Sequence, residues 1–384
     1  MTTSADSTAL NTAPAYELIR RIKEKGPVTF AEFMDCALYW GEGGYYTSGL
    51  KRWGPGGDYI TSIDVSPVFS RSIAAQLVEM WRLLGSPGAF DLVEAGAGRG
   101  LLSRGILSAL EETCPELYEA IRVRLVEKNP SLREGGAGEK TSWYGDITEL
   151  APITKGVVLS NELIDSLPVH RVLCSGGLSE IYVDFDGTRF VEVAGPLSTQ
   201  RLSGYLEDLA ISLVEGQRAE INLAAAEWME KVAALLGSGF VVTIDYGLPA
   251  RELYSPERRD GTLLCHYRHT INDNPYMNVG SQDITTHVDF TSLARSGAKA
   301  GLELTGFTTQ KNFLLGAGVL GELRASGDLG LENLENIQYN RAVSELIRPG
   351  GMGDTFKVLV QHKGIQRPAA LKGFSFREMS SYLL

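Results

Sequence analysis

Short runs of apolar residues alternate along the chain with longer stretches in which apolar residues recur every three or four positions. The short runs are typical of strands buried on both faces of a sheet, and the longer periodicity is typical of helices that pack against it. Because strands and helices follow one another in turn, we predict an α/β fold with a doubly wound, seven-stranded sheet. The strands are predicted at 90–93, 121–126, near 142, 156–160, 240–244, 302–308 and 356–362.

The remaining periodic segments predict helices, one of which has a clear start signal. Thr29 precedes the helical run 30–39, and Glu32 lies three residues further on, so the two can form a capping box. Period-two alternation over 169–194 predicts a β-hairpin or small meander, whereas 248–288 has no clear periodicity. Further helices are predicted at 15–25, 68–84, 101–110, 198–214, 221–236, 291–299 and 331–347.

Two long insertions interrupt the predicted sheet. The expected parts of the chain are a disordered tail at 1–14, an N-terminal helical cap at 15–88, and a core at 89–384 with α+β insertions at about 166–238 and 247–288. We expect the cap and the insertions to cover the carboxyl edge of the sheet as a lid. The segment 41–58, rich in glycine and aromatic residues, is either a loop that folds over a ligand or a packed surface loop.

Charge and composition argue against several classes of protein. The formal net charge of −11 argues against a nucleic-acid partner held by phosphate contacts. The 4 cysteines form no CxxC pair, and His266 and His269 have no third ligand at a metal-like spacing, so neither a metal site nor a disulfide framework is indicated. No apolar run is long enough for a membrane span. Residues 1–15 hold Asp6 but no Arg or Lys and make a poor targeting peptide, so we expect a cytoplasmic protein, with a homodimer as one oligomeric state that the sequence allows.

A glycine-rich turn after the first core strand is the strongest indication of chemistry. Glu94 is followed by alternating glycines and then by the helical run 101–110. Such a turn has no side chains above it, so a ligand can lie against the backbone. Leu101 stands where the dinucleotide-binding fingerprint requires its third glycine, so that fingerprint is absent. The glycines of the turn are Gly96, Gly98 and Gly100.

Two further acidic residues follow at positions suited to a nucleoside. Glu127 ends the strand at 121–126, and its carboxylate can accept hydrogen bonds from both hydroxyls of an unphosphorylated ribose. Asp146 follows the next strand, where an adenine amino group would be read. This order resembles a class I methyltransferase, which implies S-adenosyl-L-methionine as cofactor and S-adenosyl-L-homocysteine as product. The alternative is an ordinary strand-to-helix turn followed by two surface acids.

Separated blocks over about residues 14–363 resemble the MidA-like methyltransferases, whose mitochondrial members methylate an arginine in a respiratory complex I subunit during its assembly. The most specific block is 280–290, because generic methyltransferases do not require it. Asp64 stands where the family tends to have glutamate, and Ser70 replaces a usual glycine. These two departures from the family pattern affect the inference about the methyl acceptor more than the inference about the cofactor. The other blocks are 57–62, 93–100, 160–168 and 245–247.

The resemblance directs attention to the residues after the strand at 156–160. An arginine acceptor is always protonated, and carboxylates that grip it bidentately can orient it. Glu162 and Asp165 are candidates for this role, with Asn161 nearer the sulfonium, and His287 is a candidate proton acceptor. Alternatively, Asn161 caps a helix with the two acids in its first turn, and His287 is structural. Candidate substrate-binding residues are Asp64, Tyr246, Gln282 and Asp283.

The acceptor itself has three alternatives at this stage. The resemblance implies a protein arginine. The second alternative is the hydroxyl or carboxylate of a small molecule, which would make the protein a small-molecule O-methyltransferase. A carboxylate acceptor would need cationic anchors such as Arg251, Arg258 or Arg259. A non-catalytic assembly factor is the third. Retention of the acidic cofactor positions favours an enzyme, since a scaffold has no need of them.

Overall fold

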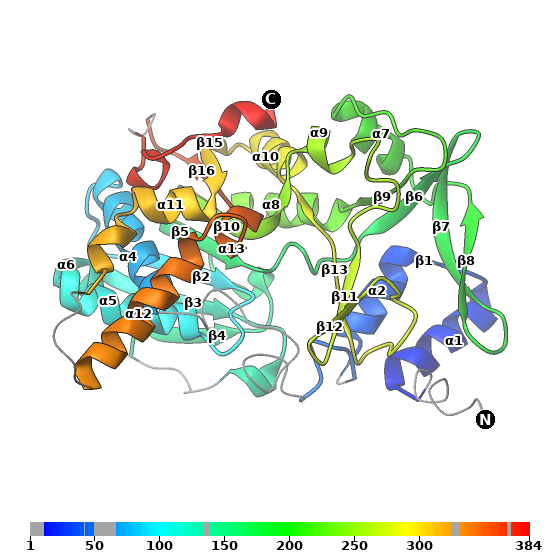
Figure 1. The fold of residues 1–384 in the computed structure, drawn as a ribbon, viewed down its shortest axis with the longest axis horizontal. Coiled ribbons are helices and arrows are strands. Elements are labelled where there is room, and N and C mark those ends of the chain that lie inside the picture. The colour runs from blue at the N-terminus through cyan, green and yellow to red at the C-terminus, as the bar shows by residue number, and fades with distance from the viewer. Residues whose placement is uncertain (1–10, 42, 50–66, 134–138, 325–330, 367–369) are drawn as a thin grey trace. The chain divides into compact units, whose positions relative to one another are not determined.

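A computed structural model describes residues 11–41, 43–49, 67–133, 139–324, 331–366 and 370–384 (Figure 1). The chain forms two compact units, each assembled from segments that are far apart in the sequence. Unit 1 consists of Met1–Tyr59, Ile164–Trp228 and Leu248–Leu293, and unit 2 of Ile60–Leu163, Met229–Gly247 and Ala294–Leu384. Asp64 and most of the segment 41–58 lie outside the described residues, so the expectations for them stay predictions.

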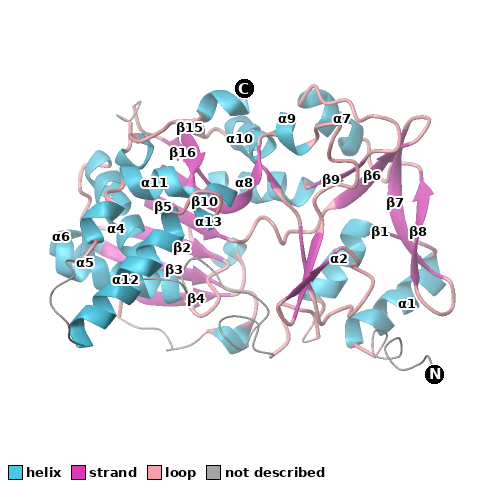
Figure 2. Ribbon diagram, in the orientation of Figure 1, coloured by secondary structure: helices cyan, strands magenta, loops and turns pink. Residues whose placement is uncertain are grey.

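Unit 2 contains the predicted sheet (Figure 2). The main path of the sheet runs in the order β15-β16-β10-β5-β2-β3-β4. The neighbouring strands from β10 to β4 are parallel, and β16 runs antiparallel to both of its neighbours. The mostly parallel α/β sheet is therefore confirmed. The strands are β2 (Phe90–Ala95), β3 (Ile121–Val126), β4 (Thr141–Tyr144), β5 (Ile153–Asn161), β10 (Leu236–Leu248), β15 (Glu303–Thr309) and β16 (Phe356–Lys363).

Helices pack on this sheet through apolar faces. In α4 (Pro67–Leu83), buried Phe69, Ile73, Leu77 and Met80 recur every three or four residues and join a core with the strands. Burying each such side chain stabilises the fold by about 1.5–3 kcal/mol. The predicted cap included this helix, but it belongs to unit 2. The other helices of this part are α5 (Leu101–Thr113), α6 (Pro115–Ala120), α11 (Gln310–Gly316), α12 (Leu331–Ile347) and α13 (Met352–Thr355).

Unit 1 is built on two small antiparallel sheets. The predicted meander is present as the strands β6, β7 and β8. Together with β1 and β9 they form one sheet, in which the order is β1-β7-β6-β9 and β8 pairs with β7. The second sheet has the order β12-β11-β13. The strands are β1 (Val28–Thr29), β6 (His170–Cys174), β7 (Leu178–Phe185), β8 (Phe190–Gly195), β9 (Arg218–Ile221), β11 (Leu264–Tyr267), β12 (Thr270–Asn272) and β13 (Asp283–Thr285).

The start of α2 (Phe30–Tyr39) confirms the predicted capping box. The Thr29 Oγ1 accepts the Glu32 N–H at 3.1 Å, and the Glu32 Oε2 accepts the Thr29 N–H at 2.9 Å. This cap directs Phe33 and Met34 into the core of unit 1. The remaining elements are α1 (Ala13–Lys25), α7 (Arg201–Asp208), α8 (Leu223–Leu235), α9 (Ala250–Leu253), β14 (Val288–Asp289) and α10 (Phe290–Lys299).

The main departure from the sequence-based expectation is in 248–288. This segment, which has no clear periodicity, contains the whole β12-β11-β13 sheet. Each of these strands has only three or four residues, too few to reveal a period of two. The helix predicted at 198–214 is present but shorter than predicted, and it spans Arg201–Asp208. The role of the cap and insertions as a lid stays a prediction.

Candidate active site

The glycine turn lies at the carboxyl end of β2, between β3 and β5. Gly98 has a left-handed φ of +53°, and a Cβ added there would meet no atom within 4 Å. Gly100 has a φ of +68°, but a Cβ added there would lie 2.8 Å from the Leu125 Cδ1. The turn therefore has open space at Gly98 and contacts the core at Gly100. A ligand can approach the backbone at Gly98, as the sequence predicts.

The buried side chain of Glu94 binds the start of the helix that follows the glycine turn. Its Oε2 accepts the Ser103 N–H at 3.1 Å and also the Ser103 hydroxyl. Ser103 is the third residue of α5, and Gly100 at the N-cap has no side chain, so Glu94 provides the cap. Burial raises the pKa of Glu94 to about 7, although the hydrogen bonds from Ser103 oppose this shift. A direct contact of Glu94 with the cofactor stays a prediction.

Glu127 meets the turn from the neighbouring strand. Its Oε2 accepts the Gly98 N–H at 2.9 Å, and its Oε1 accepts the Asn129 N–H at 2.8 Å. Each carboxylate oxygen has a second lone pair, so two ribose hydroxyls could still be accepted. Burial raises the pKa of Glu127, against the lowering effect of these backbone N–H groups. The structure thus brings Glu127 and Gly98 together, as expected for a nucleoside site.

Asp146 has a local partner. Its Oδ1 accepts the Thr148 N–H at 2.9 Å and the Thr148 hydroxyl at 2.6 Å, and it caps the 3-10 helix Ile147–Glu149. These hydrogen bonds from Thr148 hold the pKa of Asp146 below its usual range, so the carboxylate is ionised at neutral pH. The predicted contact with an adenine amino group would have to use its other oxygen.

The segment after β5 contains the next candidates. Ser160 pairs with Ala95, so β5 ends at the same edge of the sheet as β2. Asn161 is 8% exposed, and its Nδ2 donates to the Glu162 Oε1 at 3.1 Å. The Asn161 Oδ1 is buried and has no hydrogen-bond partner among the residues that the structure describes. A buried acceptor without a donor is costly, so a ligand that donates a hydrogen bond would satisfy it.

Two side chains at the end of β10 adjoin this segment in unit 2. Asp245 is fully buried, and its Oδ2 accepts the Leu163 N–H at 3.2 Å. Asp245 was not among the predicted site residues, although it lies near the end of a core strand and in the 245–247 block. Tyr246, a predicted substrate-binding residue, packs its ring against Phe356, with the ring centroids 5.6 Å apart. This contact is with the core, and a substrate contact of Tyr246 stays a prediction.

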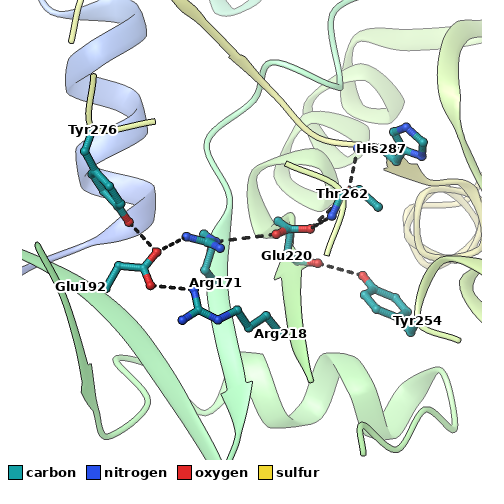
Figure 3. A network of polar contacts seen from close by, with 8 residues as sticks. All are labelled: Arg171, Glu192, Arg218, Glu220, Tyr254, Thr262, Tyr276 and His287. Atoms are coloured by element: carbon teal, nitrogen blue, oxygen red, sulfur yellow. Dashed lines mark hydrogen bonds and ion pairs between the residues drawn. The ribbon is translucent and has the colours of Figure 1, made fainter. Parts of the chain in front are cut away.

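His287 belongs to unit 1, where a buried polar network holds its backbone (Figure 3). The His287 N–H donates to the Thr262 Oγ1 at 3.1 Å, and the Thr262 N–H donates to the Glu220 Oε2 at 2.8 Å. Arg171 lies between Glu220 and Glu192, with a 2.5 Å contact from its Nη1 to the Glu192 Oε1. Burial raises the pKa of Glu220, and the charge of Arg171 opposes this shift. The network holds the backbone N–H of His287, and the role of its imidazole stays a prediction.

Two predicted substrate-binding residues have structural partners inside unit 1. Gln282 is fully buried; its Oε1 accepts the Asn272 Nδ2–H at 3.3 Å, and its Nε2 donates to the Asn274 carbonyl at 2.9 Å. The Asp283 Oδ1 accepts the Tyr46 hydroxyl at 2.8 Å. These contacts join separate segments of unit 1 and give both residues a structural role, and their substrate contacts stay predictions. Asp165 is also buried, and its carbonyl accepts the N–H of residue 286 at 3.0 Å.

Comparison with known proteins gives one family and close structural relatives. Residues 72–308 match the model of a family of S-adenosyl-L-methionine-dependent methyltransferases. The chain is 28% identical to the protein arginine methyltransferase NDUFAF7 homolog of Drosophila melanogaster, over 91% of this chain and 85% of that protein. It is also 28% identical to protein arginine methyltransferase NDUFAF7 of Homo sapiens, over 91% and 83%. A crystal structure from Burkholderia thailandensis, of a protein described as a methyl transferase and bound to S-adenosyl-homocysteine, is 30% identical, covers 99% of both chains and has a TM-score of 0.86.

The expected cytoplasmic location is wrong by this comparison. The relatives from Drosophila melanogaster and Homo sapiens are named as mitochondrial proteins. N-terminal composition was an insufficient criterion, since it tests only whether one segment has the features of a targeting peptide. Among the described residues, no helix is both long and apolar enough to cross a membrane. The same residues contain no group of three His, Cys, Asp or Glu side chains placed to hold a metal ion.

Proposed function

The chain belongs to this family of S-adenosyl-L-methionine-dependent methyltransferases, and we propose that its methyl acceptor is an arginine side chain of a protein. The predicted enzyme class and cofactor are confirmed by the family match and by the relative bound to S-adenosyl-homocysteine. The names of the Drosophila melanogaster and Homo sapiens relatives support arginine as the acceptor. The observation that carries the proposal is the Asn161–Glu162 pair at the end of β5, beside the glycine turn.

The residues at the carboxyl edge of unit 2 fit the cofactor. S-adenosyl-L-methionine supplies an activated methyl group on a sulfonium. Gly98 offers open space against the backbone, and Glu127 has lone pairs left for a ribose. The buried Asn161 Oδ1 needs a donor, and the ammonium group of the methionine part is a donor of suitable chemistry. We propose that these three residues bind the cofactor. Cofactor contacts of Glu94, Gly96, Gly100 and Asp146 stay predictions.

The acceptor side requires a carboxylate. A guanidinium keeps its proton at any physiological pH, and its lone pairs are delocalised, so it is a poor nucleophile. A carboxylate that binds two of its nitrogens concentrates charge and aligns the third for in-line attack. Glu162 holds its carboxylate next to Asn161 by the 3.1 Å hydrogen bond. We propose that Glu162 grips the acceptor guanidinium. The catalytic roles predicted for Asp165 and His287 stay predictions.

The carboxylate-acceptor alternative depends on cationic anchors, and two of its candidates have other partners. The Arg258 Nε donates to the Glu252 carbonyl at 3.2 Å, and the Arg259 Nη1 donates to the Glu215 carbonyl at 2.6 Å. Both guanidinium groups thus bind backbone carbonyls of unit 1. This arrangement favours the arginine acceptor over an anionic small molecule.

The test uses purified protein, labelled methyl donor, a mitochondrial extract and the small-molecule fraction of that extract. We expect label in protein that hydrolyses to methylarginine, and a loss of roughly 100-fold or more in Glu162→Gln, because a misaligned acceptor loses about this factor. Asp165→Asn should show a smaller loss. Glu111→Gln, which removes an exposed carboxylate from α5, is the matched control and should keep full activity.

Three outcomes would contradict the proposal in different ways. Label confined to the small-molecule fraction indicates the O-methyltransferase alternative, as a base-labile methyl ester for a carboxylate acceptor or a base-stable methyl ether for a hydroxyl. Binding of S-adenosyl-L-homocysteine without label in either fraction indicates an assembly factor. Methylarginine that persists in Glu162→Gln at the normal rate keeps the reaction but removes Glu162 from it.

A further inference from the structure

The backbone at Glu162 adopts a conformation that side chains rarely take. Its φ is +53°, in the left-handed region. For a residue with a long side chain this is uncommon, and it persists only where the surrounding structure enforces it. The strained residue lies between Asn161 and Leu163, directly after β5.

Two consecutive N–H groups of the turn are bound by the end of β10. The Glu162 N–H donates to the Ile244 carbonyl at 3.0 Å, and the Leu163 N–H donates to the Asp245 Oδ2 at 3.2 Å. The Asp245 Oδ1 accepts the Tyr246 N–H at 2.9 Å. The first contact continues the parallel pairing of β5 with β10, whereas the second requires a side-chain acceptor. The Asp245 carboxylate thus bridges the ends of two strands.

The position of Leu163 extends this bridge to the glycine turn. A Cβ added at Gly96 would lie 3.1 Å from the Leu163 Cδ1, so the Leu163 side chain packs directly against Gly96. If Leu163 shifted, both the turn after β2 and the Asn161–Glu162 pair would lose their support. The Asp245 carboxylate therefore helps, together with the Ile244 carbonyl, to hold the segment that contains Asn161 and Glu162.

We infer that Asp245 is a positioning residue of the methyl-transfer site, which keeps Glu162 in the left-handed conformation and so places the Asn161–Glu162 pair. Asp245 is fully buried, so its carboxylate acts through the turn and not by touching the acceptor. The assignment of roles to Asn161 and Glu162 rests on the proposed function, but the enforced turn does not.

The substitution Asp245→Asn tests whether the turn depends on both carboxylate oxygens of Asp245. The amide has the same shape, but it replaces one acceptor by a donor, which must then face the N–H of either Leu163 or Tyr246. The matched control is Asp91→Asn in the same sheet. Asp91 is also buried, and its Oδ1 lies 2.9 Å from the Arg124 Nη2, at the amino end of β2. Both variants remove a buried carboxylate, and only one of them acts on the turn.

The decisive readout compares Glu162→Gly with Glu162→Ala in three backgrounds: otherwise unchanged protein, Asp91→Asn and Asp245→Asn. Both changes remove the carboxylate, but only alanine is strained at φ +53°. In the first two backgrounds we expect the melting temperature of Glu162→Gly to lie about 2–4 °C above that of Glu162→Ala. In Asp245→Asn the turn relaxes, and the difference should vanish. A merely structural carboxylate would leave the difference unchanged in all three.

Binding of S-adenosyl-L-homocysteine, measured by calorimetry, provides a second readout. We expect Asp245→Asn to weaken it roughly tenfold through Asn161, and Asp91→Asn to leave it unchanged. A glycine advantage that persists in Asp245→Asn, or is absent from the otherwise unchanged protein, would overturn the inference. Unchanged affinity in Asp245→Asn would do the same. Should that variant not fold, Asp245→Ser takes its place with the same expectations.

These measurements need no methyl acceptor. Failure to detect methylarginine would therefore reject the proposed function and leave the inference about Asp245 standing. Conversely, a persistent glycine advantage would reject the inference even if arginine is the acceptor.

Discussion

Replacing Gly98 by alanine should separate cofactor binding from stability. The backbone there is left-handed, with a φ of +53°, and alanine in that conformation costs roughly 1–2 kcal/mol. The loss of freedom in the unfolded chain offsets about 0.4–1 kcal/mol of this, so the net cost is on the order of 1 kcal/mol. The new methyl group would meet no protein atom within 4 Å. It would instead enter the space that the proposed function gives to the cofactor.

Gly100 provides the opposite case within the same turn. Its φ of +68° imposes a similar strain, but a Cβ there would lie 2.8 Å from the Leu125 Cδ1 and 3.3 Å from the Trp143 ring. Overpacking of this kind adds about 1–3 kcal/mol. Gly100→Ala should therefore be destabilised by roughly 2–4 kcal/mol, while the space at Gly98 stays open.

Differential scanning fluorimetry and calorimetry with S-adenosyl-L-homocysteine test both effects. The control is Gly85→Ala, because Gly85 also has a positive φ, +83°, and open space, but follows α4 away from the turn. We expect Gly98→Ala and Gly85→Ala to lose similar thermal stability, and Gly100→Ala to lose more. Affinity should fall at least about tenfold in Gly98→Ala alone, which corresponds to about 1.4 kcal/mol. The reasoning is refuted if Gly98→Ala binds normally while Gly85→Ala or Gly100→Ala does not.

Three further predictions concern single contacts. Burial raises the pKa of Glu94 from 4.5 to about 7, so the folded protein binds this proton more tightly than the unfolded chain does. The proton therefore contributes on the order of 3 kcal/mol to the free energy of unfolding. This contribution is complete below pH 4.5 and is lost as the pH rises through 7. The melting temperature of Glu94→Gln, which cannot ionise, should therefore rise relative to that of the unchanged protein between pH 5 and 8, and a pH-independent difference would contradict the assignment. Asn161→Ala should weaken binding of S-adenosyl-L-homocysteine about tenfold by calorimetry, since a buried acceptor is lost; unchanged affinity would mean that the Oδ1 does not face the ligand. Thr29→Ala should destabilise α2 by about 1 kcal/mol and lower the melting temperature without changing cofactor affinity, and a variant that melts normally would show that the capping box adds little.

The sequence determined those parts of the protein that depend on neighbours along the chain. The capping box of Thr29 and Glu32 needs only residues three apart, and the helix it begins is found at the predicted bounds, Phe30–Tyr39. Burial on both faces leaves a continuous apolar run in β5 and β10, so the sequence predicted these two strands directly. The sequence also located Glu127 at a strand end, where the parallel sheet brings it to Gly98.

Other features depended on which distant segments meet, and only the tertiary structure decided them. The strands of β12-β11-β13 are too short to show a period, and pairing with one another defines them. Gln282 and Asp283 were predicted to bind substrate, which stays a prediction, and no local pattern identifies the loop partners that the structure gives them. Asp245 stands 82 residues from the Leu163 N–H that it accepts, and nothing near it in sequence indicates that contact. Local periodicity reports whether a residue faces the core, but a buried carboxylate acquires its role from the donor that folding brings to it.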